Sequence, residues 1–531
     1  MALTERFQGF TVAAALANRA TSDPSSVYLR YRDQVVSFGQ VESQAEALAA
    51  SLANLGVERG DRIALILPPC PEFAIALFAA AKLGATIVPL NPRLTTTELQ
   101  YMLRHSEAVC AVTIEEAYGV DYLQLFEDLI PLLPDLQYLV TVGEEDLWYD
   151  DRIFQFEDLI SAGAGRDYAS PTLDATGDRF AIVYTSGTMG KPKGVELSHA
   201  NLIAVAAGTA DAVGLGPDDR IVGLSALFHV FGLGPGLLAP LLSGSSVVLQ
   251  AESDATATLD AAEVHAATVH YGIPTLFVAE MSQLESRPRD LHTLRLAVVA
   301  GAPVSDELVG RIEAAFGVTV LAAYSLTETA STVSVSSPSH PPDKRRFTVG
   351  VPLPGTELKI VEVDGSELPV ESVGEIGVKG PGVMLGYYRQ PGETAAAFDD
   401  DGFFLTGDLG IRDEEGFLHL VGRRKDVIIR SGFNVYPREV ETRIESHPAV
   451  QEVAVVGIND ALLGEAICAC VVPVEGAIVT GHEIVDWCRE TLAEDKVPDS
   501  VRFLDALPRT DTGKVRRVEL SRVVHSESPS A

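Results

Sequence analysis

Cysteine is scarce in this sequence, which has five in 531 residues and no C-x-x-C pair. The odd count and the spacing argue against a disulfide scaffold and give no thiolate metal site. Cys468 and Cys470 lie two apart in an apolar run that is typical of a buried strand. We therefore predict a reducing, cytoplasmic compartment.

Basic residues, and lysine above all, are also few. Lys and Arg together number 40 against 74 Asp and Glu, so the formal net charge is -34, and only nine residues are Lys. A surface this negative repels nucleic acids and anionic membranes. Nucleic-acid binding is therefore disfavoured, and no nucleic-acid partner is expected.

Long apolar runs are missing as well. The most apolar stretch, 73–90, is interrupted by Lys82 and Gly84, whereas a membrane span needs about 20 uninterrupted apolar residues. The first 20 residues carry Glu5 beside Arg6 and are typical of an amphipathic helix, not of a signal peptide. We expect a soluble protein without a transmembrane segment, and the sequence leaves a homodimer open.

The chain does have ample apolar material. Hydrophobic residues make up 47% of it, which is enough for a large packed interior. At ~150 residues per domain, the length of 531 residues suits roughly three domains' worth of core. Up to about residue 340, short β-branched runs alternate with helical patterns, which predicts parallel sheets covered by helices. The predicted strands are 62–67, 85–90, 179–185, 220–226, 245–250, 295–301 and 318–324, and a helix is predicted at 71–83.

The pattern changes near Val349. From 349 to 420, short strands are cut by Gly and Pro, which predicts a small antiparallel sheet or a distorted β-barrel. Beyond residue 426, helical patterns flank an apolar strand at 451–458, which predicts a compact α+β unit.

These patterns together predict an α/β fold with two domains. Residues 1–424 form a large N-terminal domain of helix-covered sheets, with a β-barrel-like subdomain at 349–420. Residues 425–531 form a smaller α+β C-terminal domain.

The strongest chemical signal is the loop YTSGTMGKPKG, residues 184–194, which follows a predicted strand. Its Ser, Thr and Gly residues can bring O–H and N–H donors close to an anion, and Lys191 and Lys193 add positive charge. The spacing differs from that of a Walker A loop. A plain surface loop is the alternative, but two lysines so close together are unusual in a chain with nine.

This loop resembles the signature of the adenylate-forming superfamily, which includes acyl- and aryl-CoA synthetases, firefly-type luciferases and peptide-synthetase adenylation domains. Seven further segments resemble the family's motifs, in the family's order, across nearly the whole chain. They are LFHVFG (227–232), AGAPVS (300–305), YSLTET (324–329), GEIGVKGPGVMLGYY (374–388), FLTGDLG (404–410), GRRKDVIIRSGFNVYPREVE (422–441) and PRTDTGKVRR (508–517). The chain most resembles the bacterial fatty-acyl-CoA ligases.

The resemblance implies a reaction in two halves. A carboxylate attacks the α-phosphate of Mg-ATP to give acyl-AMP and pyrophosphate, and a thiol then displaces AMP. ATP, Mg²⁺ and coenzyme A are therefore expected. The first half gathers negative charge, so it needs cations and oriented donors.

The resemblance also assigns the residues that bind ATP or AMP. They are Thr185, Ser186, Gly187, Thr188 and Lys193 in the loop, Gly301, Ala302, Pro303 and Tyr324 around the adenine, Thr327 at the phosphates, Asp408 and Arg423 at the ribose, and Lys514. A carboxylate such as Asp408 can accept from both ribose hydroxyls, which fixes the register of the nucleotide. Outside this framework, Thr-Gly-Asp at 406–408 would be an ordinary turn.

Four residues are implied in catalysis: Lys514, His229, Thr327 and Glu328. Glu328 is the implied metal ligand, because Mg²⁺ keeps most of its waters and takes few protein ligands. Lys514 should bridge the attacking carboxylate oxygen and the phosphate, and His229 should position and gate rather than act as a base. Taken singly, Glu328 and Lys514 would be solvent-exposed residues, and His229 would be a core histidine.

The segment 422–433 implies how one site could run both halves. Lys425 matches the family's hinge, which implies that residues 425–531 are a mobile lid whose rotation would withdraw Lys514. The same rotation would bring Ser431, Gly432 and Phe433 to the coenzyme A tunnel, where Gly432 would let the pantetheine arm pass close to backbone.

Two positions depart from the family pattern: Ser325 and Ala300 stand where relatives usually carry Gly. Both lie near the adenine and acyl pockets, so ATP binding is expected but the shape of the pocket stays open.

The leading hypothesis is an acid–thiol ligase for a medium- or long-chain fatty acid. Gly232, Gly234 and Gly236 in the apolar run 231–242 would leave room for an acyl chain, or would only permit close packing. The alternatives are an aryl- or cinnamate-type CoA ligase, an acyl-AMP ligase that loads a separate carrier protein, and a luciferase-like oxidase. A non-catalytic nucleotide-binding protein is disfavoured, because Lys514, Glu328 and Asp408 are all present.

Overall fold

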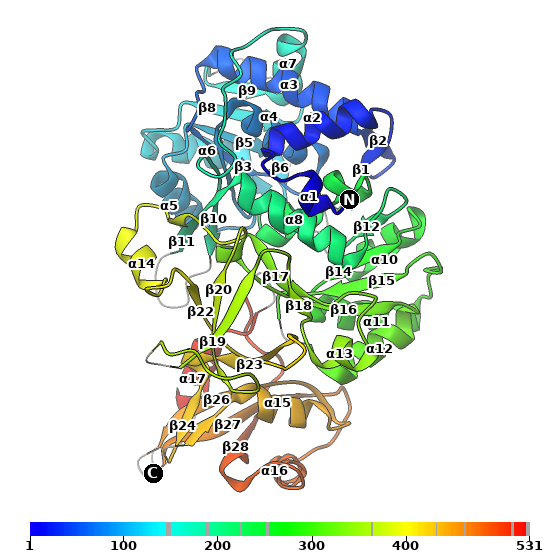
Figure 1. Ribbon diagram of the computed structural model, residues 1–531, viewed down its shortest axis with the longest axis vertical. Coiled ribbons are helices and arrows are strands. Elements are labelled where there is room, and N and C mark those ends of the chain that lie inside the picture. Colours follow the sequence, from blue (N-terminus) through cyan, green and yellow to red (C-terminus); the bar gives the residue numbers. More distant parts are fainter. Residues whose placement is uncertain are drawn as a thin grey trace.

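The structure is a computed structural model of the chain (Figure 1). It describes residues 1–144, 150–185, 192–223, 226–250, 254–302, 304–362, 365–431, 433–460, 463–510 and 514–526.

One large sheet is built mainly from the first 200 residues and has eight strands. Its central strands are parallel, and β11 joins β10 and β21 in antiparallel pairs. In sheet order the strands are β21 (Gly386–Tyr387), β11 (Lys193–Ser198), β10 (Arg179–Thr185), β4 (Thr86–Pro89), β3 (Arg62–Ile66), β5 (Cys110–Ile114), β8 (Tyr138–Val142) and β9 (Ile153–Gln155).

The second large sheet has nine strands, parallel from β1 to β16 and antiparallel at both ends. Their order is β18 (Val351–Pro352), β17 (Ser331–Val335), β16 (Thr319–Leu326), β15 (Leu296–Val299), β14 (Val269–Gly272), β12 (Arg220–Val222), β13 (Ser246–Leu249), β1 (Val27–Tyr31) and β2 (Gln34–Ser37).

The main core lies between these two sheets. Helices α4 (Pro71–Leu83) and α8 (His199–Val213) are almost wholly buried in it, together with apolar residues from both sheets. Other helices cover the outer faces: α5 (Thr96–Ser106) and α6 (Tyr122–Leu129) one sheet, and α10 (Ala255–Val264), α11 (Pro274–Ser286) and α12 (Asp306–Phe316) the other. This arrangement confirms the predicted α/β layers.

Local signals fix the ends of the helices around the site. Helix α8 begins at a capping box in which Ser198 Oγ accepts from the backbone N–H of Asn201, and the Asn201 side chain accepts from Ser198. Helix α4 starts at Pro71 and ends before Gly84, whose φ of 68° is left-handed. The predicted helix at 71–83 and the predicted strand at 179–185 are therefore confirmed.

Two predictions from the first 230 residues were wrong in detail. The N-terminal pattern forms two helices, α1 (Leu3–Arg6) and α2 (Val12–Ser22), because Gly9 turns the chain with a φ of 77°. The strand predicted at 220–226 ends at Val222, because Gly223 has a φ of 91° that strands do not adopt.

The β-rich region forms a four-stranded antiparallel sheet: β19 (Glu357–Val361), β20 (Gly374–Lys379), β22 (Phe404–Arg412) and β23 (Leu418–Arg423). Among the described residues the ladder from β19 to β23 does not close into a full barrel. Two strands from the same region, β18 and β21, join the large sheets instead, so this region is tied to both of them.

The last hundred residues form a smaller α+β unit at the lower end of the molecule in Figure 1. Its sheet contains β24 (Ile428–Arg430), β25 (Phe433–Val435), β26 (Val450–Asp460), β27 (Gly464–Pro473) and β28 (Ser500–Phe503), and its helices are α15 (Pro437–Glu445), α16 (Gly481–Arg489) and α17 (Arg517–Ser526). Cys468 and Cys470 are buried in β27, as predicted. The domain boundary at 424/425 stays a prediction.

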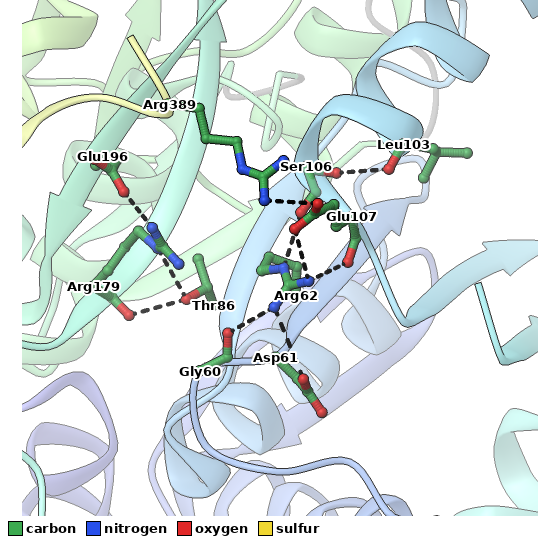
Figure 2. A network of polar contacts seen from close by, with 10 residues as sticks. All are labelled: Gly60, Asp61, Arg62, Thr86, Leu103, Ser106, Glu107, Arg179, Glu196 and Arg389. Atoms are coloured by element: carbon green, nitrogen blue, oxygen red, sulfur yellow. Dashed lines mark hydrogen bonds and ion pairs between the residues drawn. The ribbon is translucent and has the colours of Figure 1, made fainter. Parts of the chain in front are cut away.

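A polar network ties the strand that carries the glycine-rich loop to its neighbours (Figure 2). Arg62 at the start of β3 donates to the carbonyl oxygens of Ser106 and Glu107 at the end of α5, at 2.9 and 2.6 Å. Arg389, just after β21, pairs with Glu107 at 2.7 Å. These contacts therefore connect the residue after β21 to the end of α5 and, through Arg62, to β3.

No helix within the described ranges combines the length and the apolar character needed to cross a membrane.

Candidate active site

The carboxylate of Asp408 is the best-defined group of the candidate site. It lies on β22, directly opposite Arg423 on β23, and its Oδ1 is 3.0 Å from Arg423 Nε. Its Oδ2 accepts a 2.8 Å hydrogen bond from the hydroxyl of Tyr324 on β16. Asp408 and Tyr324 are both buried. Three predicted residues from two sheets thus meet at one carboxylate.

Burial and the neighbouring Asp408 charge raise the pKa of Tyr324 well above its usual value. The phenol is therefore a donor at any physiological pH. A carboxylate offers about four acceptor positions, so two remain on Asp408 for further donors such as ribose hydroxyls.

A second buried carboxylate, Glu375 on β20, supports this corner of the site. Its Oε1 accepts from the backbone N–H of Gly407 at 2.9 Å, and its Oε2 pairs with Arg424 Nη1 at 2.6 Å. Glu375 therefore connects the turn before Asp408 to the residue next to the predicted hinge. The sequence prediction quoted its motif but missed this role, because its partners are 32 and 49 residues away.

Glu328 lies in a single 3₁₀ turn, η3 (Thr327–Thr329), that follows β16. Its Oε1 accepts a 2.9 Å hydrogen bond from the hydroxyl of Tyr387, and its backbone carbonyl accepts from Met384 N–H at 2.8 Å. Burial and Glu328 together raise the pKa of Tyr387, so this phenol also stays a donor. The prediction missed Tyr387, although the residue lies within the quoted segment 374–388.

The described part of the glycine-rich loop borders the same turn. Thr185 ends β10 opposite Lys193, which begins β11. The Lys193 ammonium lies 4.7 Å from the centre of the Tyr387 ring and forms an ion pair with Glu393. Ser186, Gly187, Thr188 and Lys191 lie outside the described residues.

The adenine segment follows β15. Gly301 has a φ of 86°, which only glycine adopts without strain, and a Cβ there would lie 3.2 Å from Ile273 Cγ2. Ala302 is half-buried beside it, and Pro303 lies outside the described residues. Ala300, the departure from the family pattern, is buried.

Lys514 comes from the C-terminal unit to this site. Burial lowers its pKa, the positive charge of Arg423 lowers it further, and the carboxylates of Asp408 and Glu328 oppose both effects. Two hydrogen bonds join Lys514 to Thr510: Lys514 N–H to Thr510 Oγ1 at 3.1 Å, and Thr510 N–H to the Lys514 carbonyl at 2.8 Å. The structure thus brings Lys514 into electrostatic reach of both predicted acids.

The charge of the Lys514 ammonium also acts on the imidazole of His229. Burial, with a further effect of Lys514, lowers the pKa of His229 to about 4. Its Nδ1 accepts from the backbone N–H of Phe231 at 3.3 Å, so in the neutral ring the proton is on Nε2. His229 is therefore a neutral donor at pH 7 and not a base with a matched pKa.

The run after His229 forms a π-helix, η2 (Gly232–Leu238), whose residues are all buried. A Cβ at Gly232 would lie 2.2 Å from the carbonyl oxygen of Ala226, so this glycine is needed for close backbone packing. At Gly234, the corresponding contact with the Ala330 carbonyl oxygen would be 3.4 Å. The packing alternative therefore explains Gly232.

The described residues of the predicted coenzyme A segment, Ser431 and Phe433, are not part of this cluster. Ser431 has a left-handed φ of 53° and donates from its N–H to the Leu463 carbonyl, and Phe433 is 61% exposed. Ser431 directly follows β24, and Phe433 begins β25. Strand β24 lies at the lower end of the molecule in Figure 1, away from β16 and β22. Gly432 lies outside the described residues.

The predicted hinge residue Lys425 is exposed in the turn η4 (Arg424–Asp426), next to the Asp408 corner. Partial desolvation of the ammonium lowers the pKa of Lys425, and Arg423 adds to this effect while Asp426 opposes it.

The described residues contain no cluster of three or more His, Cys, Asp or Glu side chains that could hold a metal ion alone. The residues present nevertheless fit Mg²⁺. Glu328 offers one carboxylate held in place by a neutral donor, and Mg²⁺ binds through one or two carboxylates plus waters and substrate phosphates.

Two family models match the chain: AMP-binding enzyme over residues 16–388, and AMP-binding enzyme C-terminal domain over residues 439–514. The chain therefore belongs to the AMP-binding enzyme family, as its motifs predicted. At the level of this family, the expectation of an AMP-forming CoA ligase that uses ATP, Mg²⁺ and coenzyme A is confirmed.

Two curated relatives match nearly end to end. Feruloyl-CoA synthase from an Amycolatopsis species is 35% identical over 95% of this chain and 97% of its own length. Long-chain-fatty-acid–CoA ligase from Bacillus subtilis (strain 168) is 32% identical over 96% of this chain and 94% of its own.

Solved structures share the whole fold. The anthranilate CoA ligase AuaEII in complex with anthranoyl-AMP superimposes with a TM-score of 0.89 and 27% identity, covering 98% of this chain and 99% of its own. O-succinylbenzoate CoA synthetase from Bacillus subtilis, in complex with ATP and magnesium, gives 0.80 and 32%, covering 95% and 98%.

Proposed function

We propose that this protein activates a carboxylic acid with Mg-ATP and transfers the acyl group to coenzyme A at a single site. The observation that supports the proposal most is the charge environment of Lys514, on whose pKa the carboxylates of Asp408 and Glu328 both act. An ammonium group beside a nucleotide site is what the first half reaction requires.

In the first half, an oxygen of the carboxylate forms a bond to the α-phosphorus of ATP, and the bond from that phosphorus to the bridging oxygen of pyrophosphate breaks. Charge builds on the phosphoryl oxygens as this happens. Lys514 donates to these oxygens and to the attacking carboxylate. Asp408, oriented by Tyr324 and Arg423, accepts from the ribose hydroxyls and holds the α-phosphate in register.

Glu328 and Thr327, together with the loop from Thr185 to Lys193, hold Mg²⁺ and the phosphates. The metal neutralises charge on the phosphates when it is bound. Gly301 and Ala302 present main chain to the adenine, and the neutral His229 donates from Nε2 without taking a proton.

In the second half, the sulfur of coenzyme A forms a bond to the acyl carbonyl carbon, AMP leaves, and the thiol proton passes to solvent. Residues 425–531 turn about Lys425, so Lys514 leaves and the segment Ser431, Gly432 and Phe433 arrives. The exposure of Phe433 supports this assignment, because a buried side chain could not meet a second substrate.

The acid we propose is a medium- or long-chain fatty acid, supported by the similarity to the Bacillus long-chain ligase. An aryl acid is the second candidate, supported by the feruloyl and anthranilate enzymes. One observation favours the aryl acid. Next to the predicted acyl run 231–242, Phe231 packs on the ring of Tyr271 and Gly234 lies against Ser331. The hydroxyls of Tyr271 and Ser331 are buried without a hydrogen-bond partner in the described chain. Such hydroxyls suit an acid with polar substituents.

A panel of acids tests the function and the substrate together. Pyrophosphate release is measured with fatty acids from two to eighteen carbons and with benzoate, cinnamate and ferulate, each with and without coenzyme A. Turnover that requires coenzyme A supports the ligase. Turnover only with an acyl carrier protein would replace coenzyme A as the acceptor, and no pyrophosphate with any acid would refute the proposal.

The cytoplasmic location and a homodimer stay predictions from the sequence.

A further inference from the structure

Tyr387 reaches the predicted metal ligand from a distant part of the chain. Its hydroxyl donates to Glu328 Oε1 at 2.9 Å, although the two residues are 59 positions apart. The hydrogen bond engages one oxygen of the carboxylate and leaves Oε2 as the second acceptor. The bond therefore fixes the orientation of Glu328 and leaves one oxygen for a ligand.

The segment that carries Tyr387 is held rigidly on both sides. Strand β21 pairs with β11, with Tyr387 opposite Val195. The ring of Tyr388 carries the guanidinium of Arg179 at 4.9 Å, and Arg389 is paired with Glu107 at 2.7 Å, as Figure 2 shows for the second pair. Tyr387 itself is only 8% exposed. Its phenol therefore has little freedom to leave Glu328.

The face of the same ring carries a second functional group. The ammonium of Lys193, at the end of the glycine-rich loop, lies 4.7 Å from the ring centre. At this distance the ring attracts the cation. Lys193 also pairs with Glu393, so an anion already occupies the position next to this ammonium. One side chain thus contacts both the carboxylate predicted for the metal and the lysine predicted for the phosphates.

We propose that Tyr387 is a positioning residue that sets Glu328 for the divalent cation of a nucleoside triphosphate and keeps Lys193 beside the phosphates. This inference rests on the proposed function, because it assumes that Glu328 meets a metal–nucleotide complex. Partners that donate hydrogen bonds to a metal-binding carboxylate orient it, and their loss typically lowers metal affinity or activity about 10- to 100-fold.

The first test is Tyr387→Phe, which removes only the hydroxyl. Mn²⁺ binding is measured by electron paramagnetic resonance in the presence of ATP and without any carboxylic acid, so no turnover is involved. We expect Mn²⁺ affinity to fall about tenfold, while ATP affinity without metal stays unchanged. Raising the Mg²⁺ concentration should then restore the adenylation rate.

Tyr388→Phe is the matched control, because it removes the same atom from the adjacent residue. It should leave Mn²⁺ affinity unchanged. Tyr387→Leu is the second variant and removes the ring as well. It should lower Mn²⁺ affinity as the Phe variant does and also weaken metal-free ATP binding about two- to fivefold, because Lys193 loses its contact with the ring.

An unchanged Mn²⁺ affinity in Tyr387→Phe overturns the proposal, and so does a loss of adenylation that high Mg²⁺ does not restore. Thermal unfolding of each variant shows whether it is folded, and the Leu variant provides the same readout if the Phe variant is not. Failure of the proposed function looks different: the unaltered protein would then release no pyrophosphate with any acid, whatever its Mn²⁺ affinity.

Discussion

The corner around Asp408 and the segment around Phe433 contrast sharply, although the sequence assigns both to one reaction. Asp408 is buried and bonded to Tyr324 and Arg423 at 2.8 and 3.0 Å. Phe433 is 61% exposed, two residues after the left-handed Ser431. The Asp408 side chain is thus fixed by two neighbouring side chains, whereas the Phe433 side chain is largely open to solvent. This arrangement is the one that the proposed adenylation step needs, and in the proposed function the C-terminal unit turns before thiolation.

Lys514→Ala should give the largest effect. It tests the Asp408 side of the comparison, because it should impair the adenylation half of the reaction and spare the thiolation half. Losing one preorganised donor costs roughly 3–4 kcal/mol, or ~10²–10³ in rate. We expect that loss in acyl-AMP formation, measured as pyrophosphate release, and little change in the thiolysis of a supplied acyl-AMP. Lys496→Ala is the control, because Lys496 pairs with Glu439 on the C-terminal unit itself. Equal losses in both halves would contradict the hinge.

Asp408→Asn should weaken nucleotide binding by a smaller amount. Hydrogen bonds to a charged group contribute about 1.5–3 kcal/mol, so the KM for ATP should rise about 10- to 100-fold. Steady-state kinetics at saturating acid would measure this rise, and Asp401→Asn, at an exposed acid, is the comparison. An unchanged KM would remove Asp408 from the nucleotide site.

Lys425→Pro tests the Phe433 side of the comparison, because proline restricts the backbone at the predicted hinge and should slow the step that leads to thiolation. Substitutions at a hinge change turnover without touching the chemistry, and we expect about a tenfold loss in overall turnover. Adenylation in a single turnover should be largely retained. The prediction fails if adenylation falls as much as thiolysis.

Glu375→Gln should have a modest effect. The amide can still accept from Gly407, but the charge that faces Arg424 is lost. Because Arg424 is 56% exposed, the pair contributes only about 1 kcal/mol. The free energy of unfolding in urea should fall by about that amount, and the KM for ATP should rise severalfold. A wild-type KM would show that Glu375 does not support the Asp408 turn.

The smallest effect concerns pH. The pKa of His229 lies at about 4, below the usual 6.5, so its contribution to folding is complete above pH 6.5 and is lost as pH falls toward 4. His229→Gln should therefore flatten the fall in stability over this interval, as measured by urea unfolding at several pH values. Adenylation between about pH 6.5 and 8 should show no His229 ionisation, and a pKa near 6.5 in that profile would contradict a neutral His229.

Much of the fold could be predicted because its signals are local. Pro71 and Gly84 mark the ends of α4, and the β-branched run at 179–185 coincides with β10. The predictions failed where a glycine set the backbone: Gly9 divides the N-terminal helical pattern, and Gly223 ends β12 early.

The residues of the candidate site also differ in how far their roles could be predicted from local sequence. Asp408, Glu328 and Lys514 could be named because each lies in a motif, and the structure brings them together. Tyr387 and Glu375 could not be assigned roles, because their partners come from remote positions, and only the folded chain sets those distances. Long-range pairing is therefore what the sequence alone could not provide.

The central claim is that Lys514 is enclosed for adenylation and released for thiolation, and lysine-selective labelling followed by mass spectrometry tests it most directly. With only nine lysines, each can be followed separately, and Lys379 and Lys496 serve as internal references. We predict that Lys514 is protected in the complex with Mg-ATP and reactive in the complex with a stable acyl-AMP analogue and coenzyme A. Equal reactivity of Lys514 in both complexes would contradict the account.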